Sequence, residues 1–242
     1  EKTLELGRGT EVTTGKKKMP VVRVRDAGTR LTFTGEGVVG LHGMSKKSNP
    51  GNFGTGFVPA GANIDAGAEL VFDCKVDGFV GPAVTQKSPL ESFYFHDGAG
   101  TLSFTCTDNA FEGGIDLLSV EEENATLAFS DPAQLGLGAI RIGNAGRLLY
   151  TGTNALEFVK DLAITNKSVE LDYVPTKSFE SSAATVEQGG TGALTVMSPV
   201  DVSGTDGTAV LTLANSTASA ATWAGVLKNA ADGSKLALAK TG

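Results

Sequence analysis

The chain has 242 residues, of which 40% are hydrophobic and 32 are glycine, and its formal net charge is −7 at pH 7. The acidic balance argues against a nucleic-acid-binding surface, which needs clustered Lys and Arg. Glycine is nearly twice as frequent as usual but has no G-X-Y period, which excludes collagen, and the lack of any run of about 18 apolar residues excludes a transmembrane helix.

Nine copies of a short sequence word can be aligned along the chain, each a leucine, any residue, then an aromatic or branched residue. In chain order the words begin at Leu31, Leu70, Leu102, Leu127, Leu148, Leu171, Leu194, Leu211 and Leu236. They lie roughly 20 to 40 residues apart, a period that is typical of one structural unit copied and stacked. The repeat therefore favours an array of small units over one compact pocket built from distant parts.

A second run with β character precedes most of these words. These runs are Val22–Val24, Asn63–Asp65, Phe93–Phe95, Ile140–Ile142, Ala163–Thr165 and Val200–Val202. Gly, Asn, Asp and Ser, which adopt tight turns easily, separate each run from the next. Each unit is thus predicted to be strand, turn, strand and a longer turn, with the leucine and the aromatic residue on one face.

Stacking equivalent strands about 4.8 Å apart would bury a continuous apolar column, which no unit could do alone. We expect residues 1–242 to form one all-β domain, a parallel β-helix (β-solenoid) with little or no helix. The long early spacings predict loop insertions at Val38–Ala62 and Val76–Leu90, and Ala218–Ala231 is predicted as loop or strand, with a short helix as the alternative. A β-sandwich or antiparallel array would also give this alternation.

The two cysteines, Cys74 and Cys106, each lie four residues after a repeat leucine. If Leu70 and Leu102 begin equivalent strands, both cysteines occupy the same inward position on neighbouring units. Their Cα atoms would be roughly 5 Å apart, within the range of a disulfide. The sequence leaves a disulfide and a stacked pair of free thiols open, and two cysteines without a histidine cluster do not predict a zinc site.

One segment resembles a known family. Gly98–Gly114 reads G-A-G-T-L-S-F-T-C-T-D-N-A-F-E-G-G and resembles the autotransporter-associated β-strand repeat, whose word is G-x-G-T-L-x-L-x-G-x-N-x-Y-x-G-G. Phe104 stands at the second leucine and Phe111 at the tyrosine. Trp223–Gly242 is similar to the lead-in of another copy, and Ile140–Asn154 to the family's connecting segment.

The resemblance covers residues 93–242, and residues 1–92 are expected to be irregular units that carry the insertions. It implies a right-handed β-helical stalk in a large bacterial cell-surface or secreted protein, of which this chain is expected to be a piece. Contact with the outer membrane would come only through a C-terminal barrel outside this chain. The family's repeats imply no catalytic residues.

Motifs that carry chemistry are weak in this sequence. Gly35–Gly40 matches G-x-G-x-x-G, but the residues after it are broken by Gly and Pro, whereas a dinucleotide site needs a helix there. His42 and His96 are the only histidines, too few for a histidine metal site. Gly204–Gly207 reads as one ordinary turn, not a repeated calcium motif. We predict no catalytic, cofactor-binding or metal-binding residues.

The leading prediction is therefore a structural or adhesive passenger segment, monomeric and without enzyme activity, whose insertions contact host-surface glycans or proteins. The alternative is a carbohydrate-active β-helix, resembling a polysaccharide lyase or glycoside hydrolase, or a glycan-binding one. Such enzymes gather carboxylates on one outer face. The predicted outward carboxylates Asp73, Asp172 and Asp201 belong to different units, which favours the structural reading.

Overall fold

The computed structural model describes fourteen stretches of the chain. They are residues 3–6, 11–14, 17–41, 44–45, 57–58, 60–77, 93–95, 98–112, 114–117, 124–143, 145–165, 183–203, 208–227 and 235–242. These residues form an all-β structure of mostly parallel strands, with one short 3₁₀-helix, η2 (Pro132–Leu135). The expectation of an all-β chain with little helix is confirmed, and an antiparallel array is wrong.

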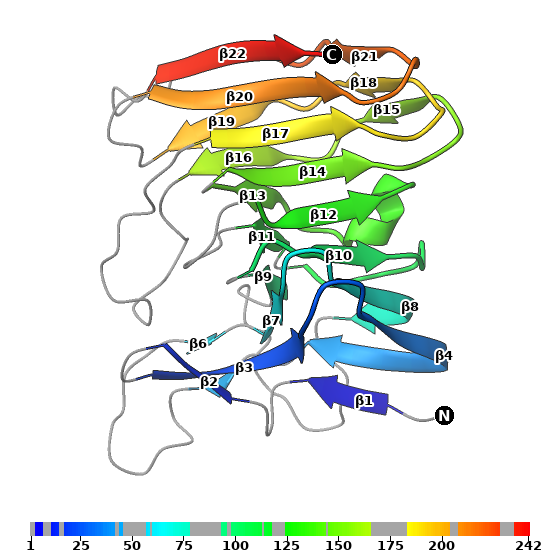
Figure 1. Ribbon diagram of the computed structural model, residues 1–242, viewed down its shortest axis with the longest axis vertical. Coiled ribbons are helices and arrows are strands. Elements are labelled where there is room, and N and C mark those ends of the chain that lie inside the picture. The colour runs from blue at the N-terminus through cyan, green and yellow to red at the C-terminus, as the bar shows by residue number, and fades with distance from the viewer. Residues whose placement is uncertain are drawn as a thin grey trace.

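The largest layer, here called the long sheet, has nine strands stacked along the long axis of the molecule (Figure 1). In spatial order they are β1 (Thr3–Leu6), β4 (Arg30–Leu41), β8 (Glu69–Asp77), β10 (Thr101–Phe104), β12 (Thr126–Phe129), β14 (Gly146–Tyr150), β17 (Ala183–Gln188), β20 (Thr208–Asn215) and β22 (Lys235–Thr241). Every neighbouring pair is parallel. Spatial order follows chain order, so each strand is added beside the previous one.

A second sheet of eight strands lies against the long sheet. Its strands are β2 (Glu11–Thr14), β3 (Lys17–Val24), β7 (Ala60–Ile64), β9 (Phe93–Phe95), β11 (Ile115–Leu117), β13 (Ile140–Ile142), β16 (Leu162–Thr165) and β19 (Val200–Ser203). All six predicted first runs fall in this one sheet. Antiparallel pairing in the described part is limited to β2 with β3 and to the small pair β5 (Met44–Ser45) with β6 (Phe57–Val58).

A third sheet was not predicted from the sequence. It contains β15 (Leu156–Phe158), β18 (Leu194–Val196) and β21 (Ala221–Trp223), all parallel. The chain therefore visits the long, third and second sheets in turn, as β14, β15 and β16, and then again as β17, β18 and β19. The predicted unit of two strands is incomplete here, because a third short strand joins them.

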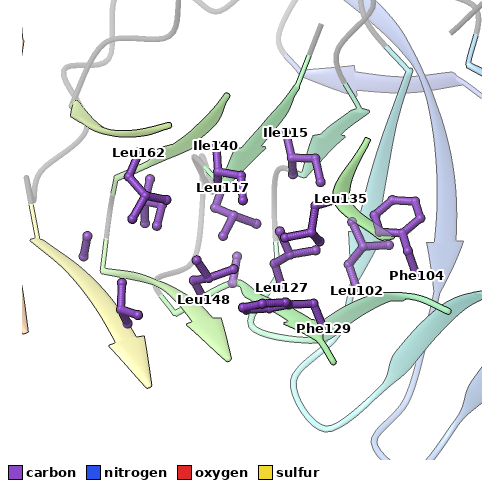
Figure 2. Close-up of a cluster of buried hydrophobic side chains, with 14 of the residues drawn as sticks. Leu102, Phe104, Ile115, Leu117, Leu127, Phe129, Leu135, Ile140, Leu148 and Leu162 are labelled. Atoms are coloured by element: carbon purple, nitrogen blue, oxygen red, sulfur yellow. The ribbon is translucent and has the colours of Figure 1, made fainter. Parts of the chain in front are cut away.

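The repeat leucines of the long sheet form one column in the core. Backbone register aligns Leu31 with Leu70, Leu70 with Leu102, Leu102 with Leu127 and Leu127 with Leu148. Figure 2 shows Leu102, Leu127 and Leu148 in a row, facing Ile115, Ile140 and Leu162 of the second sheet. Leu70, Leu102, Leu127, Leu148 and Leu162 are all almost wholly buried. Each fully buried leucine contributes about 1.5–3 kcal/mol.

A second column, two residues further along each strand, changes character along the stack. It begins with rings: Phe33 stacks on Phe72 with centroids 5.2 Å apart, and Phe72 on Phe104 at 5.4 Å. It then passes from Phe129 to Tyr150 and on to the amides Gln188 and Asn215. The spacing of the rings fits the favourable range for aromatic pairs, which adds to the burial energy.

Each polar side chain of this column stabilises the turn that follows its own strand. Tyr150 Oη donates to Asn154 O at 2.5 Å, Gln188 Nε2 donates to Gly192 O at 2.8 Å, and Asn215 Nδ2 donates to Ser219 O. Each bond joins a side chain to the carbonyl four residues later, at the corner between the long and third sheets. Buried polar groups need such partners, so the amides can replace the aromatic rings in the column.

Small residues at this corner let successive turns approach closely. A Cβ built on Gly192 would lie 1.8 Å from Asn154 O, and one on Gly190 would lie 2.1 Å from Gly152 O. Glycine is required at these positions because the backbone of the previous turn occupies the space of a side chain.

Three of the nine words depart from the expected column. Leu194 lies in the third sheet, where it pairs with Leu156 and Ala221. Leu211 aligns with Leu238 rather than with Leu236, because β20 and β22 pair two residues out of the expected register. Alternation places a leucine on the inner face of any sheet, so the word alone does not specify which sheet or register it joins.

The predicted loops are partly strand. Residues 38–41, at the start of the Val38–Ala62 insertion, belong to β4, and Val76 belongs to β8. Most of the remainder of both insertions lies outside the described residues, as does the word at Leu171. Within Ala218–Ala231 the described part contains the strand β21, as one of the alternatives predicted.

Candidate functional site

The most chemically distinctive place in the described structure is a bulge between β4 and β8. The two strands pair regularly up to Thr34 opposite Asp73, then shift and resume at Val38 opposite Lys75. Gly35, Glu36 and Gly37 therefore stand against the single residue Cys74. Gly35 has φ 131°, which side chains rarely adopt, so glycine permits the bulge.

The bulge opens a surface hollow of about 450 Å³, here called the thiol hollow. It is lined by Gly35, Glu36, Gly37, Val38, Asp73, Cys74, Lys75, Thr105, Cys106 and Asp108. These residues come from β4, from β8 and from the turn that follows β10. The hollow thus brings three carboxylates, one ammonium group and both cysteines of the chain to one place.

Two hydroxyl groups donate hydrogen bonds to the Asp73 carboxylate in the thiol hollow. Asp73 accepts a hydrogen bond from Thr34 Oγ1 at 3.2 Å on one neighbouring strand. It accepts another from Thr105 Oγ1 at 2.5 Å on the other side. Asp73 therefore links three successive segments of the long sheet instead of standing free toward a substrate.

The cysteines lie on neighbouring segments, as their spacing predicts, but not in the same inward position, because β10 ends at Phe104 and Cys106 lies in the turn after it. Both are free thiols. Cys74 is buried on the inner side of β8, and Cys106 is half-buried. The Cys106 Sγ–H donates to Asp108 Oδ1 at 2.5 Å. Of the two alternatives left open by the sequence, the structure contains the pair of free thiols.

Electrostatics keep both thiols protonated. Burial, followed by the nearby Cys106 and Asp73, raises the pKa of Cys74. Burial, together with the bond to Asp108, raises the pKa of Cys106. The same bond, with Lys75 Nζ at 3.7 Å, lowers the pKa of Asp108. Since the thiolate is the nucleophile, this arrangement restrains thiol reactivity at neutral pH.

Beside the thiol hollow, a buried amide joins three segments. Asn109 Oδ1 accepts from Val76 N at 2.6 Å, and Asn109 Nδ2 donates to Cys106 O at 2.9 Å and to Gln134 O at 2.7 Å. Gln134 Nε2 in turn donates to Thr105 O at 3.1 Å. Neither amide was predicted from the sequence. The repeat word that Gly98–Gly114 resembles has an asparagine at the place of Asn109, which was the signal that could have indicated that residue.

A second hollow, of about 350 Å³, lies beside η2 and is here called the lysine hollow. It is lined by Pro132, Ala133, Leu137, Gly138, Ala139, Val159, Lys160 and Asp161. Lys160 Nζ donates to Gly136 O at 2.7 Å, and burial lowers the pKa of this amine. Leu137 and Val159 at the rim are each 67% exposed. Nothing in the sequence pattern singled out Lys160.

On the outer face of the long sheet, charges pair between neighbouring strands. Arg30 NH1 lies 3.3 Å from Glu69 Oε2, and Arg147 NH1 lies 3.0 Å from Glu187 Oε2. Arg147 Nε also donates to Thr126 Oγ1 at 3.3 Å. Exposed pairs of this kind contribute at most about 1 kcal/mol each. Their direction is the notable feature, because each pair crosses from one repeat unit to the next.

The structure does not gather the predicted outward carboxylates. Asp73 lies on β8 of the long sheet and Asp201 on β19 of the second sheet, while Asp172 lies outside the described residues. His42, His96 and the turn at Gly204–Gly207 also lie outside them. The glycine motif at Gly35–Gly40 lies within the strand β4, whereas a dinucleotide site places it in the turn between a strand and a helix.

Within the described stretches, no group of three or more His, Cys, Asp or Glu side chains is placed to hold a metal ion. The same stretches contain no helix of the length and apolar character needed to cross a membrane. Comparison with family models, with curated proteins and with solved structures gave no match to this chain.

Proposed function

We propose that the chain forms a right-handed parallel β-helix that serves as a stiff stalk in a bacterial cell-surface or secreted protein of the autotransporter type. Its work would be structural and adhesive: to hold loops away from the cell and present them to host-surface glycans or proteins. The sequence resemblance supports the family, and the sheet topology supports the architecture.

One observation carries the architectural part. Equivalent residues stack in register in all three sheets: the leucines of the long sheet, Ile115 with Ile140 in the second, and Leu156 with Leu194 in the third. The passage from β14 to β21 through three parallel sheets in turn, with one strand added each time, supports the proposal of a helix of β-strands. The right hand follows from the strong preference of parallel crossovers for that hand.

Stiffness follows from the direction of the bonds. Backbone hydrogen bonds between strands run along the long axis of the stack in Figure 1, and bending it would stretch them in at least one sheet. Side chains add bonds in the same direction, as Asn109 and the Arg147–Glu187 pair do. Each unit contacts only its neighbours, so such a column keeps its stiffness as it lengthens.

Adhesion rests on the insertions, since loops on a regular column tolerate variation and commonly carry binding residues. The test replaces residues 46–56, 79–90 or both with short Gly-Ser linkers, which leaves β4 and β8 intact. Binding of each variant to glycan arrays and to host-cell surfaces is then measured beside the unmodified chain. We expect the double replacement to abolish binding while circular dichroism stays unchanged; equal binding would contradict the role of the insertions.

A second measurement addresses the stalk itself. Limited trypsin digestion should leave the strands of the long sheet from β8 to β20 uncut, because each is hydrogen-bonded on both sides, and early cleavage within these strands would contradict a proteolysis-resistant stalk. The carbohydrate-active alternative is addressed by incubating the chain with pectin, mucin glycans and dermatan. New reducing ends or unsaturated uronates would favour that alternative over a stalk.

A further inference from the structure

The two thiols lie near each other on neighbouring segments, since both line the thiol hollow and Cys106 is close enough to influence the pKa of Cys74. The pairing that aligns Leu70 with Leu102 also aligns Phe72 with Phe104, and Thr105 N donates to Phe72 O at 3.0 Å as the last ladder bond of this pairing. Cys74 and Cys106 lie two residues beyond the phenylalanine pair. Neighbouring strands lie about 4.8 Å apart, and disulfides join Cα atoms about 4.4–6.8 Å apart.

The bulge gives solvent a route to this pair. Without it, the backbone of β4 would pair with β8 opposite Cys74, as it does on both sides of the shift. Instead Gly35, Glu36 and Gly37 form a bulge that interrupts the pairing, and both cysteines line the hollow beside it. Cys106 is half-buried and Cys74 is buried, so a reagent that enters from solvent meets Cys106 first.

We propose that Cys74 and Cys106 are a modification site for an external disulfide, which converts them into an intramolecular bridge between β8 and the turn after β10. The reagent class is a small dithio compound such as oxidised glutathione, or the exposed disulfide of a thiol oxidase. The bridge would bind two successive repeat units to each other.

The chemistry balances as two thiol–disulfide exchanges. The Cys106 thiolate, after losing its proton to solvent, attacks one sulfur of the external disulfide and forms a mixed disulfide, and the other half leaves as a thiolate. The Cys74 thiolate then attacks Cys106 Sγ and releases the second half. Two protein thiols are oxidised by two electrons, the external disulfide is reduced to two thiols, and the two protons pass through solvent to the leaving thiolates.

The surroundings make the reaction dependent on pH. The charged groups that face the pair are Asp73 and Lys75 on β8, Glu36 in the bulge and Asp108 in the turn. Burial is the largest cause of the raised pKa of each thiol. The fraction of thiolate, and with it the rate of bridge formation, therefore increases as pH rises from 7 toward 9 and beyond.

The bridge has a measurable consequence for stability. It closes a loop of about 30 residues, and the chain-entropy model then predicts a rise in Tm of roughly 10 °C for a chain of this size. The reduced and bridged forms have the same sequence, so the comparison does not depend on the folding of a variant.

The experiment treats the reduced chain with oxidised glutathione at pH 8.5, then maps peptides without reduction and measures Tm. Cys106→Ser and Cys74→Ala are matched controls, each with one thiol. We expect a Cys74–Cys106 peptide in the monomer, loss of both thiols, and the higher Tm, while each control gives only a glutathione adduct. Stable glutathione adducts on both cysteines of the native chain, disulfide-linked dimers alone, or unreacted thiols would each overturn the proposal.

Discussion

Replacing Leu127 with alanine tests the leucine column where it is most enclosed. Leu127 is 0% exposed and lies between Leu102 and Leu148 on strands that are hydrogen-bonded on both sides. Removing three carbons at about 0.8 kcal/mol each costs about 2.4 kcal/mol of transfer free energy. The flanking strands cannot move in to fill the gap, so a cavity cost is added, and the total loss should reach about 3–5 kcal/mol.

The control is Leu149→Ala, one strand along, whose side chain lies on the outer face of β14 and is partly exposed. We expect it to cost about 1 kcal/mol or less, because solvent fills the space. Urea unfolding, followed by circular dichroism, measures both variants, and the Leu127→Ala midpoint should fall by roughly 1–2 M. Equal losses in the two variants would refute the assignment of an inner column and an outer face.

Three further changes test the corners and the thiols. Gly192→Ala should destabilise the chain strongly, because its Cβ would meet Asn154 O at 1.8 Å. Gly189→Ala should be tolerated, because the only contact under 3.0 Å that its Cβ would make is with the flexible end of Leu149. Thermal melts compare the two variants. Asn109→Ala should lower the free energy of unfolding, measured in urea, by about 2–4 kcal/mol, because it leaves the Val76 N–H and two carbonyls unpaired. A loss under about 0.5 kcal/mol would contradict the role of this amide in joining the three segments. Burial raises the pKa of Cys74 in the folded chain. The stability that the protonated thiol contributes is therefore present below pH 9 and is lost as pH rises through the pKa of the folded chain. Between pH 8 and 10.5, the Tm of the reduced chain should fall more steeply than the Tm of Cys74→Ala.

The strand pairing was readable from the sequence where local pattern and long-range packing agree. Leu102, Leu127 and Leu148 begin equivalent words, and equivalent words pair because similar side chains then fill the same space in each unit. The six runs from Val22–Val24 to Val200–Val202 share one sheet for the same reason.

The third sheet escaped prediction because its strands show the same alternation as those of the other sheets; their length of three residues is shared by β9 and β13, which were predicted. Leu194-Thr-Val196 satisfies the alternation of any sheet equally well, so only the length of the preceding turn decides where it lies. That turn is set by Gln188 and its bond to Gly192 O, a contact between residues with no apolar signal.

The thiol hollow was half predictable. The equal offsets of Cys74 and Cys106 from their leucines gave their neighbouring positions, but not the opening beside them. The opening depends on the shift of β4 against β8, and Gly35-Glu36-Gly37 reads in the sequence as a glycine motif rather than as a bulge.

The most direct test of in-register stacking measures distances between residues that lie in one row on the outer face of the long sheet. The register places Arg30, Thr101 and Thr212 on a single line across the long sheet, with Thr101 and Thr212 four strands apart and Arg30 and Thr212 six. Nitroxide labels are attached in pairs at these positions on a Cys74→Ala, Cys106→Ser background. Pulsed electron paramagnetic resonance should then give narrow distance distributions at about 19 Å for positions 101 and 212 and about 29 Å for positions 30 and 212, four and six times the strand spacing of about 4.8 Å. Broad distributions, or separations that do not grow with the number of strands between the labels, would contradict the stacking of successive units in register.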